Sequence, residues 1–303
     1  MYLFTANNIF KRYANHTALE DVSISVSNNT VFGLLGPNGA GKTSLIRIMN
    51  QITGPDSGEL FFDGEKLNPK HVSQIGYLPE ERGLYKKMEV GEHALYLAQL
   101  KGMKRPEAMK KLKIWFEKFE MTGWWKKKVE ELSKGMQQKV QFIVTVLHEP
   151  RFLILDEPFS GFDPINANSI KNELLRLKSN GTTILLSTHN MSSVEELCDE
   201  IALLNRSKKI LEGKVSEIRK AYSTNTFEVE FKGNILGFTN AMGAGAQLLE
   251  QEQMGEICKV KIKLSGGNTP NDLLHSVMNV SQIRGLREMI PSMNDIFIAK
   301  VNE

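Results

Sequence analysis

The chain reads Gly36-Pro37-Asn38-Gly39-Ala40-Gly41-Lys42-Thr43-Ser44 between an apolar stretch at residues 30–35 and an amphipathic stretch at residues 43–50. The first eight of these residues match the pattern G-x-x-x-x-G-K-[ST], which cradles phosphate groups. The flanking stretches predict a buried strand before the loop and a helix after it. The sequence therefore supplies both the loop and the structural context that such a loop requires.

Three glycines suit this loop to a polyphosphate. Without Cβ atoms, Gly36, Gly39 and Gly41 allow the backbone to curl into a nest of inward-pointing N–H groups. The following helix directs the positive end of its dipole to the same point. We expect Lys42 to reach the β- and γ-phosphates of ATP and the Thr43 hydroxyl to bind Mg²⁺. Together with the rest of the stretch through Ser44, these residues form the predicted nucleotide-binding loop.

Two acidic residues follow a second predicted strand. Residues 152–155 are an apolar run too short for a helix, and Asp156 and Glu157 come directly after it. A central parallel strand delivers such side chains to the crevice at its carboxyl end. We expect Asp156 to hold Mg²⁺, directly or through water, and Glu157 to take a proton from the attacking water. Alone, two acids after a strand can also be a helix cap and a solvated turn.

A third motif, Leu132-Ser133-Lys134-Gly135-Met136-Gln137-Gln138-Lys139, precedes apolar residues at helical spacing. The spacing predicts an amphipathic helix over residues 134–148, with Ser133 as its N-cap. A capped helix start is an anion site, and it can serve the nucleotide of another subunit. The motif resembles the signature L-S-G-G-Q of the ATP-binding cassette (ABC) family. This resemblance implies that Ser133 and Gly135 contact the γ-phosphate held by a partner subunit.

Further motifs similar to those of the ABC family occur in order along the chain. Tyr13 matches the aromatic residue that stacks on adenine, and Asp163 matches a contact across the dimer. His189 matches the switch histidine, whose imidazole can hydrogen-bond both a γ-phosphate oxygen and the catalytic water. Residues 76–80 match the segment that links the γ-phosphate site to the membrane subunit. Taken singly, the tyrosine and the histidine can be structural residues, and the Asp-Pro pair can be a turn.

Three residues depart from the family pattern. Glu80 stands where glutamine is usual, so a carboxylate would face Mg²⁺ and the attacking water and could ligate the metal. Lys134 and Met136 replace a glycine and the glutamine of the signature, which removes a reciprocal Ser-x-x-Gln cap. These changes allow a second interpretation, a subunit that binds ATP without hydrolysing it. The intact loop lysine, acid pair and histidine favour an active ATPase.

Composition indicates a globular protein with one large and one small domain. The 303 residues are 41% hydrophobic and 24% charged, and the formal net charge of +3 is too small to indicate a nucleic-acid partner. No run approaches the ~20 apolar residues needed to cross a bilayer, and the first residues lack the features of a signal peptide. We therefore expect a cytoplasmic protein in which Cys198 and Cys258 are free thiols. Lysine clusters at residues 110–113 and 126–128 are predicted to be solvated faces, or alternatively to lie near anionic lipid.

The predicted fold class is α/β: a P-loop NTPase with a mixed sheet core and a helical subdomain, over residues 1–215. An antiparallel region is predicted at residues 2–5, 18–26 and 60–62. Parallel strands are predicted at residues 30–35, 152–155, 182–186 and 201–204. Helices are predicted at residues 90–101, 106–119 and 134–148, within the block 83–148 where the family carries its helical subdomain. The resemblance also implies a surface for a membrane partner at residues 80–101, with candidate contacts Tyr85, Leu95 and Leu97. At helical spacing such residues are core more often than interface.

A second domain is predicted at residues 222–303, after a linker at residues 221–225. Its predicted order is β-α-β-β-α-β, which indicates a small α+β, ferredoxin-like layer. The strands are predicted at residues 226–232, 246–250, 256–264 and 283–289, and the helices at residues 235–242 and 270–278. Residues 291–297 resemble the close of an accessory domain found on some bacterial drug or sodium exporter ATPases. Its expected role is dimer contact or regulation, with packing alone as the alternative.

The resemblance as a whole implies the ATP-hydrolysing subunit of an ABC exporter, acting on a separate integral-membrane permease at the inner face of the cell membrane. Two ATP molecules with Mg²⁺ would lie between the Gly36 loop of one subunit and Ser133 and Gly135 of another, in a homodimer or a paralogous heterodimer. A soluble cassette ATPase acting on a macromolecule and a non-hydrolysing regulatory subunit remain the alternatives. No nucleic acid is expected as a partner.

Overall fold

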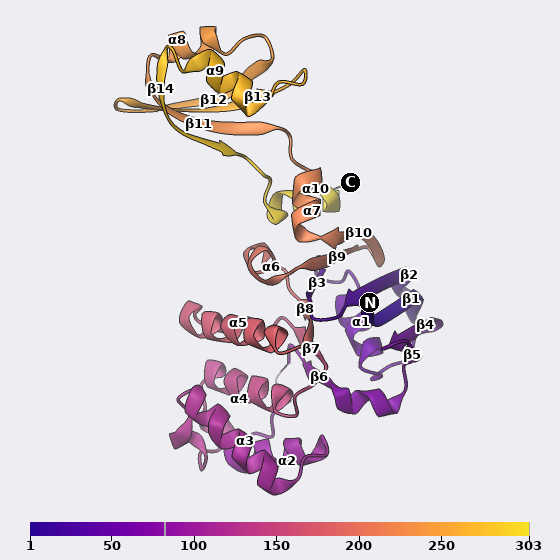
Figure 1. Ribbon diagram of the computed structural model, residues 1–303. Coiled ribbons are helices and arrows are strands. Elements are labelled where there is room, and N and C mark those ends of the chain that lie inside the picture. The colour runs from indigo at the N-terminus through magenta and orange to yellow at the C-terminus, as the bar shows by residue number, and fades with distance from the viewer. Residues whose placement is uncertain (82, 303) are drawn as a thin grey trace. The chain divides into compact units, whose positions relative to one another are not determined.

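The computed structural model describes residues 1–81 and 83–302, and Figure 1 shows its helices and strands. Contacts within the chain divide it into two compact units, Met1–Val215 and Ser216–Glu303. Each unit buries its own hydrophobic cluster. Arg82 and Glu303 lie outside the described residues, so the predicted partner surface at residues 80–101 and the predicted second domain are each described without one residue.

The first unit opens with an antiparallel sheet of order β2-β1-β4-β5. The strands are β1 (Tyr2–Tyr13), β2 (His16–Ser27), β4 (Ser57–Phe62) and β5 (Glu65–Lys66). The predicted antiparallel region is confirmed, but β1 continues well past residue 5. Register shifts around Ile9 interrupt the alternation that marks a strand in the sequence. As a result, Tyr13 stands at the far end of β1, opposite His16.

The second sheet has the order β10-β9-β3-β8-β7-β6. Its parallel strands are β3 (Val31–Leu35), β6 (Ile75–Leu78), β7 (Phe152–Asp156), β8 (Thr183–Ser187) and β9 (Glu200–Asn205), and β10 (Lys208–Lys214) runs antiparallel to β9. Every residue of β3, β7 and β8 is buried, as expected for central parallel strands. The predicted mixed sheet is confirmed. The sequence did not predict β6, a short strand that contains a glycine, or the polar edge strand β10.

Helices surround these sheets in the first unit. They are α1 (Lys42–Met49), α2 (Val90–Leu100), α3 (Arg105–Lys118), α4 (Lys134–Val146), α5 (Pro164–Ser179) and α6 (Met191–Leu197), with 3₁₀ turns η1 (Pro69–Gln74), η2 (Thr122–Trp124) and η3 (Val129–Glu131). The predicted helical block is confirmed as α2, α3 and α4, inserted between β6 and β7. Its core is aromatic: the Trp115 ring stacks on Phe119 and meets Phe142 edge-on.

One predicted contact for a membrane partner is wrong. Leu95 is only 3% exposed, because it faces the core of the helical block from α2. Tyr85, in contrast, is 52% exposed. Helical spacing alone could not separate the inner face of this helix from its outer face.

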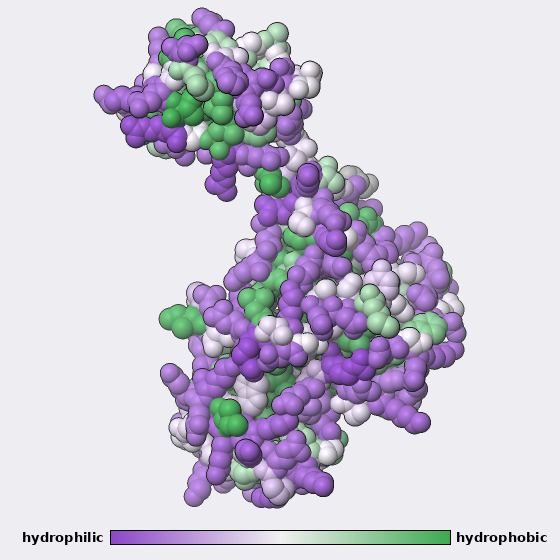
Figure 2. Space-filling model, viewed as in Figure 1, coloured by the Kyte–Doolittle hydropathy of each residue, from purple (hydrophilic) through white to green (hydrophobic). Residues whose placement is uncertain are grey.

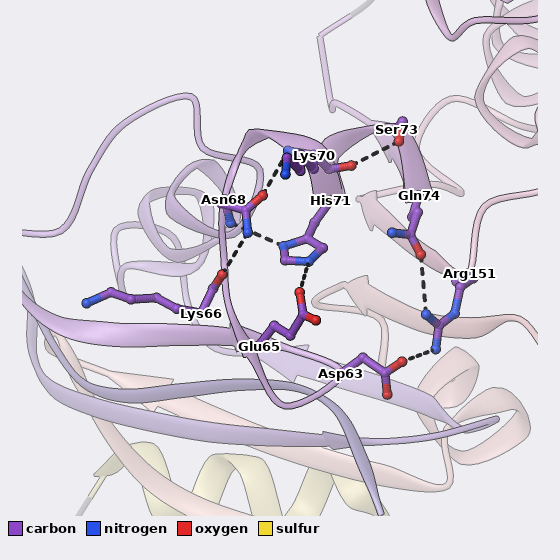
Figure 3. Close-up of polar contacts among 9 residues, drawn as sticks. All are labelled: Asp63, Glu65, Lys66, Asn68, Lys70, His71, Ser73, Gln74 and Arg151. Atoms are coloured by element: carbon purple, nitrogen blue, oxygen red, sulfur yellow. Dashed lines mark hydrogen bonds and ion pairs between the residues drawn. The ribbon is translucent and has the colours of Figure 1, made fainter.

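A polar cluster holds η1, the 3₁₀ turn before β6, against the antiparallel sheet and the start of β7. Figure 3 shows Asn68 capping η1, with its side-chain oxygen accepting from the Lys70 N–H. The His71 ring lies 3.4 Å from a Glu65 oxygen and stacks on Phe62. Arg151, one residue before β7, bridges the other side of the cluster by hydrogen bonds to Asp63 at 2.7 Å and Gln74 at 3.3 Å. The antiparallel sheet, η1 and the start of β7 are thereby held together.

The second unit has the predicted ferredoxin-like topology. Its elements are β11 (Thr226–Gly233), α8 (Ile235–Ala241), β12 (Ala246–Met254), β13 (Ile257–Leu264), α9 (Pro270–Val277) and β14 (Ser281–Glu288). The sheet order is β12-β13-β11-β14 and all neighbours are antiparallel. Helices α8 and α9 lie on one face, where the Phe231 and Phe238 rings stack at 4.1 Å (Figure 1). The sequence did not predict α7 (Val215–Ala221) or α10 (Met293–Asn302).

The face of the molecule shown in Figure 2 is largely hydrophilic, with scattered apolar residues. None of the helices in the described part of the chain combines the length and apolar character that a bilayer crossing requires. The expected free thiols are confirmed, since both Cys198 and Cys258 are buried and form no disulfide.

Candidate active site

A pocket forms where the carboxyl ends of β3, β6, β7 and β8 meet the tip of the β1–β2 hairpin. It brings together most of the residues that the sequence singled out, from five separate stretches of the chain. The lining residues are Tyr13, His16, Ala18, Asn38, Gly39, Gly41, Lys42, Thr43, Ser44, Glu80, Asp156, Glu157 and His189. Gly36, Pro37 and Ala40 complete the loop between β3 and α1.

The loop conformation depends on glycine at both ends. Gly36 has φ of +150°, and a Cβ placed there would lie 2.4 Å from the Leu204 carbonyl oxygen. Gly41, just before α1, has φ of +108°, and its Cβ would lie 2.3 Å from the Ala18 carbonyl oxygen. Any other residue would clash with the backbone of β9 or β2. Helix α1 then starts at Lys42 with its N-terminus at the pocket, where a phosphate is favoured.

Lys42 is held over its own loop. Its Nζ donates hydrogen bonds to the carbonyl oxygens of Gly36 at 2.8 Å and Pro37 at 3.1 Å, and the residue is only 8% exposed. Burial lowers the pKa of Lys42, whereas the nearby acids Glu157, Asp156 and Glu80 act in the opposite direction. The ammonium group therefore lies in an enclosed site among carboxylates, where phosphate oxygens could replace the two carbonyl partners.

Asp156 is fixed from the neighbouring strand. It ends β7, is 3% exposed, and accepts a hydrogen bond from the Ser187 hydroxyl. Ser187 is its register partner on β8 and also accepts, through its carbonyl oxygen, the Glu157 N–H at 3.1 Å. Sequence reasoning missed this role of Ser187. The available signal was a hydroxyl residue that ends the strand paired with β7.

Glu157 and His189 form a hydrogen-bonded pair at the pocket wall. The Glu157 Oε1 lies 2.7 Å from the His189 Nδ1, and the side chains are 13% and 70% exposed. Glu157 has a φ of +47°, a left-handed conformation that disfavours a residue with a Cβ. The turn points its carboxylate toward the histidine and the pocket. A carboxylate with an orienting imidazole is an arrangement that can activate water.

The residues predicted to bind a metal fit Mg²⁺. Thr43, Glu80 and Asp156 supply hydroxyl and carboxylate oxygens to one pocket, and such hard ligands suit this ion. With Glu157, the pocket wall carries three carboxylates against the single ammonium of Lys42, which favours a cation. Within residues 1–81 and 83–302, no group of three or more acidic, histidine or cysteine side chains forms a complete metal cage. Mg²⁺ at nucleotide sites is commonly held by one or two carboxylates plus phosphate oxygens, so this arrangement agrees with the ion.

Tyr13 lines the pocket from the tip of the β1–β2 hairpin. The Lys11 Nζ sits 5.4 Å from the centre of its ring and is held by Asp56 at 2.8 Å. The tyrosine is 41% exposed, which leaves ring surface available to a base. His16, its partner across the hairpin, also lines the pocket and was missed by sequence reasoning. The sequence signal for His16 was its spacing: it follows Tyr13 after the two residues of a tight turn, so the two side chains leave the same hairpin tip.

Outside the phosphate loop, three predicted residues do not line this pocket: Ser133, Gly135 and Asp163. Ser133 is confirmed as the N-cap of α4, and its Oγ accepts the Met136 N–H at 3.3 Å. The Asp163 carboxylate caps α5 by accepting two backbone N–H groups at 3.0 Å, and the hydrogen bonds from Asn166 lower the pKa of Asp163. A Cβ on Gly135 would lie 3.9 Å from the Phe162 ring, so the starts of α4 and α5 are neighbours.

The fold and the pocket together define a class. A parallel sheet carries a glycine-rich phosphate loop after β3, a lysine and a threonine at the start of α1, and an acid pair at the end of a central strand. This combination belongs to the P-loop nucleoside triphosphatases.

Comparison with known proteins narrows this class to one family. A family model described as ABC transporter matches residues 19–160, and one described as ATP-binding protein DrrA1-3-like, C-terminal domain, matches residues 213–301. The uncharacterized ABC transporter ATP-binding protein YhaQ of Bacillus subtilis (strain 168) is 38% identical over 299 residues, 99% of this chain and 98% of that protein. The chain therefore belongs to the family of ABC transporter ATP-binding proteins.

Two further similarities extend this comparison. The linearmycin resistance ATP-binding protein LnrL of the same organism is 32% identical over 219 residues, 71% of this chain and 70% of that protein. A solved structure of the ATP-binding subunit of an ABC transporter matches with a TM-score of 0.68 and 29% identity, over 73% of this chain and 93% of that one. The predicted family and fold class are confirmed.

Proposed function

We propose that the chain is the ATP-hydrolysing subunit of an ABC exporter. The observation that carries this proposal is the Glu157–His189 pair, 2.7 Å apart on the wall of the pocket that also contains Lys42, Thr43 and Asp156. A base and its orienting imidazole beside a phosphate loop are the groups that ATP hydrolysis needs. A subunit that only binds nucleotide has no use for this pair.

Each residue then has a defined task. Lys42 exchanges its two carbonyl partners for oxygens of the β- and γ-phosphates, and Tyr13 stacks on adenine. Glu157 accepts a proton from the attacking water, which His189 helps to orient. Thr43, Asp156 and Glu80 are the residues that would hold Mg²⁺, which neutralises charge on the phosphates.

The pocket of one copy is half of the complete site. Ser133, Gly135 and Asp163 lie outside their own pocket, at the adjoining starts of α4 and α5. Ile165, in the first turn of α5, is 82% exposed, as suits a residue covered by a partner. We infer that this surface closes over the nucleotide of a second copy or of a paralogous subunit, so that two ATP molecules lie at the dimer interface.

A second groove supports docking to a membrane permease. Its volume is about 640 Å³, and it lies between the η1–β6 segment and the helical block. Leu97, one of the contacts expected from the sequence, lines it together with Tyr77 and Leu100. Because β6 leads directly to Glu80, a permease segment in this groove would sense the state of the nucleotide site. The subunit would then lie on the cytoplasmic face of the membrane.

Export is the proposed direction of transport. LnrL is named for resistance to linearmycin, and the second unit matches the DrrA1-3-like C-terminal domain. Resistance by a transporter requires that the compound leaves the cell. Co-purification of the chain from detergent extracts with a multi-spanning membrane protein would separate this role from that of a soluble cassette ATPase.

The decisive test is Glu157→Gln. The amide keeps the shape of the side chain but cannot accept the proton, so we expect turnover of ATP to fall by about 10²- to 10⁴-fold. Affinity for ATP should remain close to that of the parent, because Lys42 and the loop are intact. The matched control is Glu230→Gln, which makes the same chemical change on the sheet of the second unit. Full turnover in the Glu157→Gln protein would contradict the proposal, and an inactive parent would favour the non-hydrolysing alternative.

A further inference from the structure

Helix α4 carries two buried glutamines that reach the loops of the pocket acids. Gln138 and Gln141 are 7% and 5% exposed and lie three residues apart, on one face of the helix. The Gln141 Nε2 lies 3.3 Å from the Pro79 carbonyl oxygen and 3.5 Å from that of Glu81. The Gln138 Nε2 donates to the Pro158 carbonyl oxygen at 3.1 Å.

These carbonyl groups adjoin the two acids that face the terminal phosphate. The Pro79 carbonyl shares a planar peptide unit with the Glu80 nitrogen, so a bond to that oxygen fixes the backbone of Glu80. Pro158 follows Glu157 directly, and its ring restricts the backbone at that point. A shift of either glutamine would therefore move an acid of the site.

The same helix presents the surface expected to meet a second subunit. Ser133 caps α4, and Gln138 and Gln141 lie within the next three turns of one uninterrupted helix. A short helix transmits a displacement of its end with little bending. A displacement of Ser133 on contact with a second subunit's nucleotide would therefore be transmitted along α4. Two hydrogen bonds would pass it on to the backbone beside Glu80 and Glu157.

Packing alone does not explain the amide at position 138. The Gln138 Oε1 is buried and has no hydrogen-bond partner among the residues that the structure describes. An unpaired buried carbonyl is unfavourable, and an apolar side chain of similar size would avoid the cost. The remaining contribution of this side chain is the hydrogen bond from its Nε2 to Pro158.

We propose that Gln138 and Gln141 are positioning residues that couple the start of α4 to Glu157 and Glu80. Through these hydrogen bonds, the positions of the two acids depend on the position of α4, whose N-terminus is expected to meet the second subunit. The inference rests on the proposed function, because it assigns these acids to ATP hydrolysis. It adds a route by which closure of the dimer could control the chemical step.

The test replaces each glutamine by methionine, which keeps length and volume but removes the N–H donor. Gln251→Met is the matched control, because it makes the same change at an exposed position of β12, in the second unit. We expect kcat for ATP to fall about tenfold in Gln138→Met and in Gln141→Met, with KM changed less than about twofold. The control should keep kcat within about twofold of the parent.

A second readout needs no catalysis. In the nucleotide-free protein, hydrogen exchange should rise at residues 80–81 in Gln141→Met and at residues 157–160 in Gln138→Met, and at neither segment in Gln251→Met. Should a methionine variant unfold, asparagine at the same position is the substitute. Its amide is too short to reach the carbonyl partner, and kcat and hydrogen exchange are measured in the same way.

Exchange and kcat equal to those of the control would overturn the coupling, even with a fully active parent. An active Glu157→Gln protein would instead refute the proposed function, and the exchange pattern would still report on the hydrogen bonds.

Discussion

The two units of the chain differ in the polar side chains that they bury. Among the described residues of Met1–Val215, the buried lysine, histidine and acidic side chains are Lys42, His71, His93, Asp156 and Glu173. Among those of the second unit, the buried polar side chains are Thr226 and Ser281 only. Burying a charge is costly unless it has partners, so proteins retain such groups where they act. The comparison therefore locates the chemistry of this chain in the first unit.

The second unit keeps its charges on the open face of its sheet. Glu228 and Glu230 on β11 stand opposite Lys261 and Lys259 on β13, and Lys261 also pairs with Glu250 at 2.5 Å. Such exposed pairs contribute little to stability, because solvent screens the charges. The β11 and β13 residues on this face include no aromatic side chain of the kind that stacks on RNA bases. Its features suit packing or a protein contact.

The largest expected effect is loss of ATP binding in the first unit. Lys42→Ala removes the only ammonium group among the residues that line the described pocket, and we expect affinity for ATP to fall by at least about 100-fold. Titration calorimetry would measure it. Lys261→Ala, the same change on the open sheet of the second unit, is the control and should bind ATP like the parent. Normal affinity in the Lys42→Ala protein would remove the basis for placing phosphate at this loop.

The next effect should be confined to the second unit. Phe231 is fully buried against Phe238, so Phe231→Ala should destabilise this unit by about 3–5 kcal/mol. Hydrogen exchange over residues 226–264 should report the change. ATP affinity should stay unchanged, because every residue of the pocket lies in the first unit. A loss of ATP affinity in the same variant would show that the second unit also contributes to ATP binding.

A smaller effect should follow pH. His93 is fully buried with both ring nitrogens unpartnered among the described residues, and burial lowers the pKa of His93 from 6.5 to about 4. Because the unfolded chain takes up this proton first, the folded state loses stability as pH falls from about 6.5 to about 4. His93→Leu should reduce that loss by about 2 kcal/mol between pH 7 and pH 4.5.

Urea unfolding at the two pH values would measure this difference. His148, whose pKa burial also lowers to about 4, is present in both proteins and cancels in the comparison. An equal loss of stability in parent and variant would mean that His93 is not the group that takes up the proton.

Local patterns predicted the parts of the molecule that depend on neighbours in sequence. The phosphate loop, the acid pair after β7 and the Ser133 cap are short motifs whose chemistry and conformation are set within a few residues. The ferredoxin-like order was likewise predictable, because strict alternation marks β11 and β13. Where register shifts broke the alternation, as near Ile9, the predicted strand was too short.

The remainder depends on contacts between distant segments. Ser187 and Gln141 meet the acid loops only after β7, β8 and α4 are assembled, and no local pattern marks either residue. Leu95 was named as a candidate partner contact because periodicity shows that a helix has an apolar face, but not which neighbour covers it. Tertiary packing decides such cases.

The left-handed backbone conformation of Glu157 constrains how this position can evolve. A left-handed residue with a long side chain sacrifices stability that glycine or asparagine at the same position would recover. If Glu157 is the base of the proposed function, selection for a more stable fold and selection for turnover act against each other at this position. A lineage that no longer needs hydrolysis should lose this glutamate early, while the phosphate loop persists.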